Sequence, residues 1–197
     1  MAIKRRRGWS IEDKMEKETN SIRAQCFKML NITQVTQDIL HWSETFVEVP
    51  HPALGNFPPC PFARKARLSG TVRVVVGTDP YFDLRNCSRD GLGTAEVVIY
   101  AYDPAEWDYD TFHSSLDQAN REFLLANDLL VLEDHPADPE IVNGISMNQG
   151  TYALAMLQSL SKLNTAAQQM HHKGFYESWP KPYLEQLFQH RVDPRNA

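Results

Sequence analysis

The chain has 197 residues, of which 42% are hydrophobic and 10% aromatic, and its net charge is −5. This length and composition are typical of one globular domain that buries its own core. The negative charge argues against a protein that binds nucleic acid over a broadly basic surface, and the N-terminus carries a basic arm at residues 4–7. We expect that arm to be solvated, with phosphates or an anionic partner as the alternative.

No apolar run approaches the roughly 18 residues that a membrane-spanning helix needs, and the first residues lack the hydrophobic stretch of a signal peptide. The three cysteines are an odd number without a close pair, which argues against a disulfide framework or a multi-cysteine zinc site. We therefore expect a soluble cytoplasmic protein with reduced thiols and no membrane partner. The sequence does not indicate an oligomeric state.

Two helices are predicted before residue 50. The first follows Ser10, a good N-cap, and carries apolar residues at helical spacing as far as Leu30. The second ends before Pro50. Its apolar stripe consists of Val35, Ile39, Trp42 and Phe46.

Two runs rich in β-branched and aromatic residues, 72–76 and 97–102, predict strands. The second run is apolar throughout, so we expect it to be central in its sheet. Between them, residues 77–93 contain proline, glycine and asparagine without clear periodicity. This predicts a long loop, and loops of that length often carry function.

A helix beginning at Asp108 or Asp110 is predicted next, followed by a short strand over residues 129–132. Strand, helix and strand of these lengths form a βαβ unit, which predicts that the second and third strands are parallel. A turn-rich segment, residues 134–139, leaves the third strand.

The sequence after residue 139 predicts one long helix, from Asn148 or Thr151 to Met170. It also predicts a last helix after residues 178–180. Together these elements predict an α+β fold with a small mixed sheet between N- and C-terminal helices. The nearest common shape is ferredoxin-like. Within one compact domain we distinguish a helical segment (1–50), an α+β core (51–170), and a C-terminal helix with its tail (171–197).

The run from residue 57 to 67 is the strongest candidate for a chemical site, because prolines, aromatic rings and cations surround Cys60. Pro61 can open a short helix with Cys60 as its N-cap, which would direct backbone N–H groups at the sulfur. With Arg64 and Lys65 nearby, this arrangement favours the thiolate and predicts that Cys60 is the most reactive thiol. The alternative is a buried structural cysteine in a proline-braced turn.

Two histidines were weighed as further candidates. His135, just past the third strand between Asp134 and Asp138, suits a general base or a surface turn. His113 has aspartates at i−3 and i+4 on its predicted helix, which suits a metal site or a solvated face.

The Cys60-Pro61-Phe62-Ala63 element, with the cation and strand that follow, resembles the Leu-Cys-Pro-Phe-Ala-Lys motif of bacterial proteins built on domain of unknown function 1415. Further elements match in order, namely Tyr102-Asp103-Pro104, Tyr109-Asp110-Thr111-Phe112, His135-Pro136, Asn148 and Tyr152. This chain departs from the family at Pro58-Pro59 and at Asp134. That family has no settled activity, so the resemblance implies fold and site location more than function.

The same region is also similar to the Phe-Pro-Cys-x-Phe-Gly segment, and the ensuing Gly-Thr-Leu-Arg strand, of a bacterial family that includes haem-dependent N-oxygenases. Here the matching residues are Phe57 to Phe62 and Gly70-Thr71-Val72-Arg73. The resemblance implies haem or iron as a cofactor, with a cysteine thiolate as a candidate ligand.

Three hypotheses follow. In the first, an enzyme pocket joins Cys60 to the base His135, assisted by Asn148, and acts on a small anionic substrate. The cations expected to hold that substrate are Arg64, Lys65 and Arg67. In the second, the protein binds haem or iron, and in the third it is a non-catalytic interaction module. Trp179, Tyr183 and Phe188 would then be an aromatic anchor, or else core.

Overall fold

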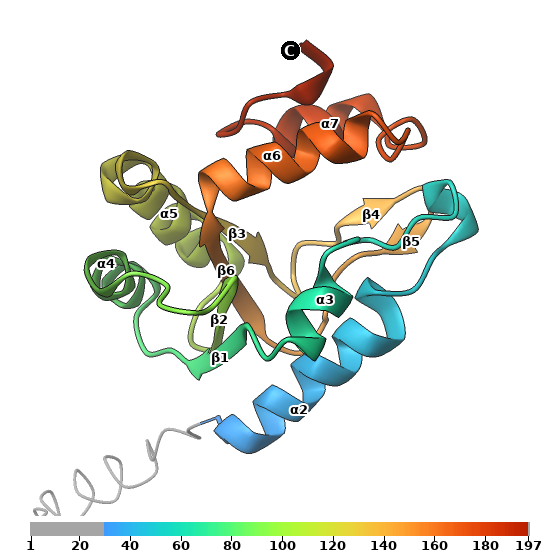
Figure 1. Ribbon diagram of the computed structural model, residues 1–197. Coiled ribbons are helices and arrows are strands. Elements are labelled where there is room, and N and C mark those ends of the chain that lie inside the picture. The colour runs from blue at the N-terminus through green and yellow to red at the C-terminus, as the bar shows by residue number, and fades with distance from the viewer. Residues whose placement is uncertain (1–29, 197) are drawn as a thin grey trace, which may run out of the picture.

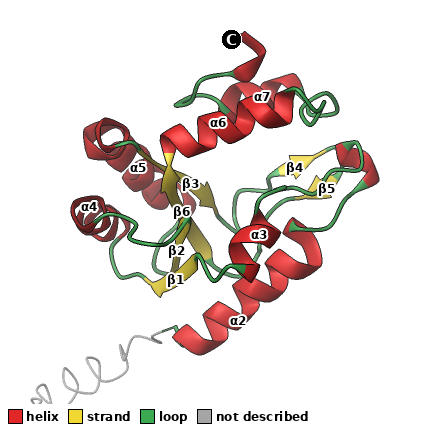
Figure 2. Cartoon of the chain, viewed as in Figure 1, coloured by secondary structure: helices red, strands yellow, loops and turns green. Residues whose placement is uncertain are grey.

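The structure is a computed structural model that describes residues 30–196. The basic arm and nearly all of the helix predicted from Ser10 to Leu30 lie outside the described residues. At the centre is a four-stranded mixed sheet, with helices on both faces (Figure 1). The predicted α+β class with a small mixed sheet is confirmed (Figure 2).

The main sheet consists of β1 (Val72–Val76), β2 (Val97–Tyr102), β6 (Ala153–Ser159) and β3 (Leu129–Asp134), in that order. The helices are α2 (Ile32–Trp42), α3 (Ala63–Leu68), α4 (Pro80–Asp90), α5 (Tyr109–Ala119), α6 (Leu160–His171) and α7 (Lys181–Leu187). A two-stranded hairpin, β4 (Ile141–Val142) and β5 (Ile145–Ser146), completes the fold.

The direction of the strands agrees with the predicted βαβ unit. The order of the strands and helices along the chain, however, does not suit a ferredoxin-like shape. β1 and β2 are parallel, whereas β6 runs antiparallel to both β2 and β3. β2 and β3 are therefore parallel as predicted, with β6 inserted between them. Because two helical crossovers follow each other, β1-α4-β2-α5-β3, the chain lacks the βαββαβ order of ferredoxin-like folds.

The long loop predicted over residues 77–93 is wrong, since most of it forms α4. The Asp79 side chain accepts a hydrogen bond from the Phe82 N–H at 3.0 Å, and Pro80 occupies the first turn. Leu84 and Cys87 are buried against the sheet. An N-cap aspartate followed by proline was the available signal for a helix start.

The long helix predicted from Asn148 or Thr151 is also wrong in its first half, which is strand β6. The run from Ala153 to Leu157 is rich in helix-forming residues, so local propensity favours a helix. Between β2 and β3, however, this segment forms ladders on both edges and buries both faces. Tertiary context outweighs propensity here, and α6 begins only after Ser159.

The β4–β5 hairpin was missed, although Asn143-Gly144 is a strong signal for a tight turn. Both residues have left-handed backbones, with φ of 51° at Asn143 and 83° at Gly144. The Asn143 side chain also donates hydrogen bonds to the carbonyls of Ala53 at 2.8 Å and Ser178 at 2.6 Å. The turn thereby joins the hairpin to two distant segments.

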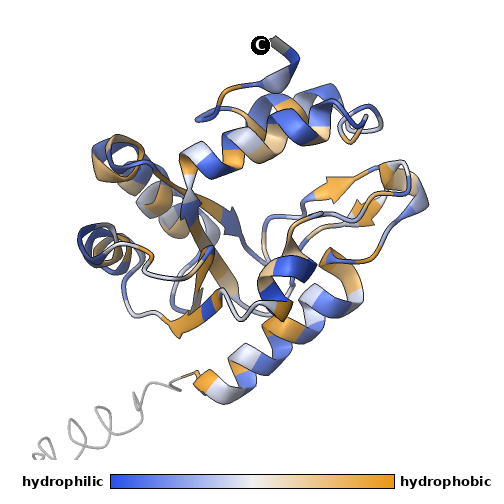
Figure 3. Ribbon diagram, viewed as in Figure 1, coloured by the Kyte–Doolittle hydropathy of each residue, from blue (hydrophilic) through white to orange (hydrophobic). Residues whose placement is uncertain are grey.

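The two faces of the sheet carry different helices. α4 and α5 cover one face, where Leu84, Phe112 and Leu116 pack on β2, β3 and β6. α2 packs on the other face through Val35 and Ile39, and polar and hydrophobic residues alternate along the helix (Figure 3). At the outer edge of β3, the Asn120 amide donates to the Val131 carbonyl at 3.1 Å and its oxygen accepts from the Val131 N–H at 3.0 Å. This side chain blocks further strand pairing there.

The C-terminal helices form a third apolar cluster. Phe175, Trp179 and Phe188 are buried in it, together with Leu54 and Val142 from distant parts of the chain. The proposed aromatic anchor is therefore mainly core, because two of its three rings, Trp179 and Phe188, are at most 7% exposed. Among the described helices, none is long and apolar enough to cross a membrane.

Candidate functional site

A cleft of about 720 Å³ opens over the β3 and β6 half of the sheet. α2 lies over the other half, so the side chains of two cross-strand pairs remain as floor, Leu130 with Gln158 and Leu132 with Met156. Further lining comes from the end of α2, from α5, and from α7 with the tail that follows it. The cleft thus combines an apolar floor with polar groups from several elements, as small-molecule sites commonly do.

Cys60 lines this cleft, but it is not the N-cap of a helix. α3 begins at Ala63 with Phe62 as its N-cap, so Cys60 lies two residues earlier. Burial raises the pKa of the Cys60 thiol, and the backbone N–H groups of Phe62 and Ala63 offset only part of that rise. The prediction that Cys60 favours the thiolate is wrong. Desolvation of the thiolate outweighs its stabilisation by the backbone N–H groups, so the thiol form is favoured.

None of the three cations proposed to bind substrate is among the described residues that line the cleft. Arg64 and Lys65 are exposed on α3. Arg67 binds Glu48 through two contacts, Nε to Oε1 at 2.7 Å and Nη2 to Oε2 at 3.0 Å, which hold the pKa of Glu48 below its ordinary value. The Arg67 guanidinium therefore braces the end of α3 against the segment after α2.

His135 lines the cleft, but both of its ring nitrogens are engaged by the backbone. Nδ1 accepts the Ala137 N–H at 3.1 Å, which leaves Nε2 to donate to the Trp107 carbonyl at 2.9 Å. The residue is only 2% exposed. A neutral imidazole in this tautomer has no lone pair left to accept a proton, so its geometry suits a structural role better than general-base catalysis.

The side-chain amide and oxygen of Asn148 are likewise engaged in hydrogen bonds with neighbouring residues. Its amide donates to Asp134 Oδ1 at 3.0 Å and to the His135 carbonyl at 3.2 Å, while its oxygen accepts the Glu140 N–H at 2.9 Å. The residues that line the cleft include Cys60, His135 and Asn148. Within residues 30–196, however, no hydrogen bond joins Cys60 to His135 or Asn148.

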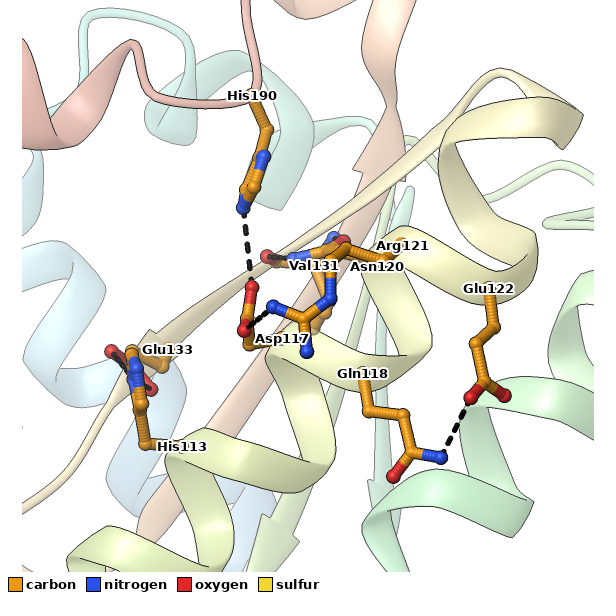
Figure 4. A network of polar contacts seen from close by, with 9 residues as sticks. All are labelled: His113, Asp117, Gln118, Asn120, Arg121, Glu122, Val131, Glu133 and His190. Atoms are coloured by element: carbon orange, nitrogen blue, oxygen red, sulfur yellow. Dashed lines mark hydrogen bonds and ion pairs between the residues drawn. The ribbon is translucent and has the colours of Figure 1, made fainter.

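A different histidine at the cleft has a free nitrogen. His113 Nδ1 lies 2.8 Å and 3.0 Å from the two carboxylate oxygens of Glu133 (Figure 4). This contact makes Nδ1 the donor, so Nε2 carries the lone pair when the ring is neutral. The side chain is 48% exposed, and the Tyr109 ring lies 5.6 Å from it between centroids. An imidazole oriented by a carboxylate is the arrangement of a general base.

A second histidine–carboxylate pair lies beside the first. Asp117, one turn after His113 on α5, has Oδ1 3.4 Å from His190 Nε2, and its other oxygen binds Arg121 (Figure 4). Of the residues considered for a metal site on this helix face, His113 contacts Glu133, and Asp117 contacts Arg121 and His190. The described residues hold no cluster of three or more histidine, cysteine or carboxylate side chains suited to a metal ion.

The charge of the cleft is negative. Its described lining contains no lysine or arginine, and its carboxylates are Asp117, Glu133, Asp134, Asp138 and Glu140. Burial raises the pKa of Asp134 and of Glu140, although Asn148 and Tyr183 respectively hydrogen-bond to them. Such a lining favours neutral or positively charged ligands over the anionic substrate expected from the sequence.

The haem or iron ligation implied by the second resemblance stays a prediction. Burial raises the pKa of the free Cys60 thiol, but a metal ion would itself deprotonate a coordinating cysteine. The segment continues directly into the turn before α3, where Ala63 N–H donates to the Cys60 carbonyl at 3.3 Å.

Comparison of the chain with models of protein families, with curated proteins and with solved structures found no match. The two family resemblances therefore rest on the sequence motifs alone. The Glu133–His113 pair was missed because its partners are 20 positions apart on different elements. The sequence signal is His113 itself, whose spacing points to aspartates on its own helix and not to Glu133.

Proposed function

We propose that the protein is an enzyme that binds a small neutral or positively charged molecule in the cleft and acts by general-base catalysis at Nε2 of His113. The observation that carries this proposal is the contact between Glu133 and His113 Nδ1 at the edge of the cleft. Glu133 orients the ring and stabilises the imidazolium that forms when Nε2 takes a proton. The base would remove this proton from the substrate or from a water molecule.

The floor of the cleft supports this proposal. Leu132 and Met156 are partly exposed and offer apolar surface that would displace water from a bound ligand. Cys60 lies in the wall as an uncharged thiol, which suits contact with an apolar part of the ligand better than nucleophilic attack.

p-Nitrophenyl acetate is a suitable probe, because a neutral, accessible imidazole reacts with this activated ester whatever the natural substrate is. We expect the protein to hydrolyse it at pH 7.5 and His113→Gln to lower the rate by about 10²-fold, the usual contribution of a general base. His172→Gln removes an exposed histidine outside the cleft and is the matched control. A rate that His113→Gln leaves equal to that of the control would overturn the proposal.

A further inference from the structure

The two histidine–carboxylate pairs present different nitrogens to the cleft. Glu133 binds Nδ1 of His113, whereas Asp117 faces Nε2 of His190. In the neutral state the hydrogen bond to Glu133 places the proton of His113 on Nδ1, and the Asp117 carboxylate, 3.4 Å away, favours Nε2 as the protonated nitrogen of His190. The open nitrogens are Nε2 of His113 and Nδ1 of His190.

The two pairs are neighbours on one helix face. His113 and Asp117 are four residues apart on α5, so their side chains project side by side. His190 reaches the same face from the segment after α7, and both rings line the cleft. The charged groups near the two rings are Asp110, Asp117 and Arg121 from α5 and Glu133 from β3.

We infer that His190 is the general acid that complements the base His113, and that the reaction moves two protons. This inference rests on the proposed function. It assigns the substrate class as small neutral or cationic molecules, such as alkyl esters, whose leaving group must gain a proton as it departs. Asp117 is a positioning residue, since its carboxylate lies 3.4 Å from His190 Nε2 and orients the ring.

For an ester the step balances as follows. His113 Nε2 takes a proton from water while the water oxygen forms a bond to the acyl carbon. The bond from that carbon to the alkoxy oxygen then breaks, and His190 Nδ1 gives its proton to that oxygen. The products are a carboxylic acid and an alcohol, and exchange with solvent returns His113 to the neutral form and His190 to the protonated form.

Two esters separate the two roles. p-Nitrophenolate leaves as a stable anion and needs no acid, whereas the ethoxide of ethyl acetate must be protonated. We expect His190→Gln to lower hydrolysis of ethyl acetate by about 10²-fold, a loss about tenfold or more larger than its effect on p-nitrophenyl acetate. His113→Gln should lower both rates, and His172→Gln should change neither.

The outcomes distinguish the inference from the proposed function. If the protein hydrolyses p-nitrophenyl acetate through His113 but His190→Gln leaves the ethyl acetate rate unchanged, or if ethyl acetate is not hydrolysed, the acid role of His190 is overturned. If His113→Gln changes neither rate, the base is wrong as well.

The tautomers supply a readout that does not depend on activity. Nitrogen chemical shifts of the ¹⁵N-labelled protein above the titration of both rings should show His113 protonated on Nδ1 and His190 on Nε2. Asp117→Asn should change the signals of His190 and leave those of His113 in place. The opposite tautomer at His190 would overturn the assignment of its open nitrogen to the cleft.

Discussion

The chemical role of a histidine in a cleft depends on the hydrogen-bond partners of its two ring nitrogens. His135 and His113 both line the same cleft, but the first donates to Trp107 and accepts from Ala137, whereas the second has one nitrogen on Glu133 and one open. The buried ring is thus a structural crosslink and the half-exposed ring is available for proton transfer. Cys60 follows the same rule, since its surroundings decide its protonation.

Replacing His135 tests this difference. His135→Ala removes two hydrogen bonds and leaves a cavity beside Phe112, so we expect the free energy of unfolding to fall by about 3 kcal/mol. Urea denaturation measures this loss. His172→Ala, at an exposed position, should stay within about 0.5 kcal/mol of the unchanged protein.

Cysteine alkylation supplies the second measurement on this variant. Because both nitrogens of His135 bind the backbone, its removal should leave the rate at Cys60 unchanged in conditions where the variant remains folded. A rate at Cys60 that fell severalfold would instead support the catalytic pair that the sequence suggested.

At the scale of elements, close packing requires glycine at one position and backbone geometry requires it at another. Gly77 follows β1, and a Cβ added there would lie 2.1 Å from the Tyr102 ring. That ring is fully buried beside Trp107 and Phe112, so it has little room to move. Gly144 has open space around it, and there the left-handed turn alone requires glycine.

The pair Gly77→Ala and Gly144→Ala separates these two causes. We expect the first to destabilise the protein by more than about 3 kcal/mol through overpacking and the second by about 1 kcal/mol through backbone strain. Thermal and urea unfolding of both variants measure the difference. Equal losses would show that the Tyr102 ring moves aside without cost.

At the scale of the whole molecule, the helices of the two faces leave half of one face uncovered, and the C-terminal segment reaches across to it. The cleft is therefore built from α2, α5, β3, β6 and α7, which are distant in the chain.

The buried carboxyl groups of the cleft also affect the stability of the whole fold. Burial raises the pKa of Glu140 above its ordinary 4.5, whereas Arg67 lowers that of Glu48.

These opposite shifts predict opposite dependences of stability on pH. The folded protein binds a proton at Glu140 more tightly than the unfolded chain, so this contribution is present below pH 4.5 and is lost as the pH rises through the raised pKa. Glu48 contributes above pH 4.5 and loses its contribution as the pH falls through its lowered pKa.

We therefore expect Glu140→Gln to reduce the loss of stability above pH 4.5, and Glu48→Gln to reduce the loss on acidification. Urea denaturation from pH 3 to 8 measures both. Tyr183 can still donate to the amide oxygen in Glu140→Gln, which keeps the packing matched. A Glu140→Gln variant with the same pH profile as the unchanged protein would contradict the effect of burial.

The sequence by itself determined the elements whose local pattern and tertiary role agree. The stripe of Val35 and Ile39 predicted α2, the β-branched runs predicted β1 and β2, and Asp108 marked the start of α5. The position of Cys60 at a cleft was also indicated. In these cases the side chains that favour the element are the ones that the core then buries.

Only the tertiary structure decided β6 and the chemistry of the cleft. The Ala- and Leu-rich run of β6 favours a helix locally, and it becomes a strand because two neighbouring strands hydrogen-bond to both of its edges. Likewise, the pKa of Cys60 depends on burial, and the state of His113 depends on Glu133 from another element. Desolvation and long-range pairing arise only when distant segments meet, so the spacing of residues along the chain does not reveal them.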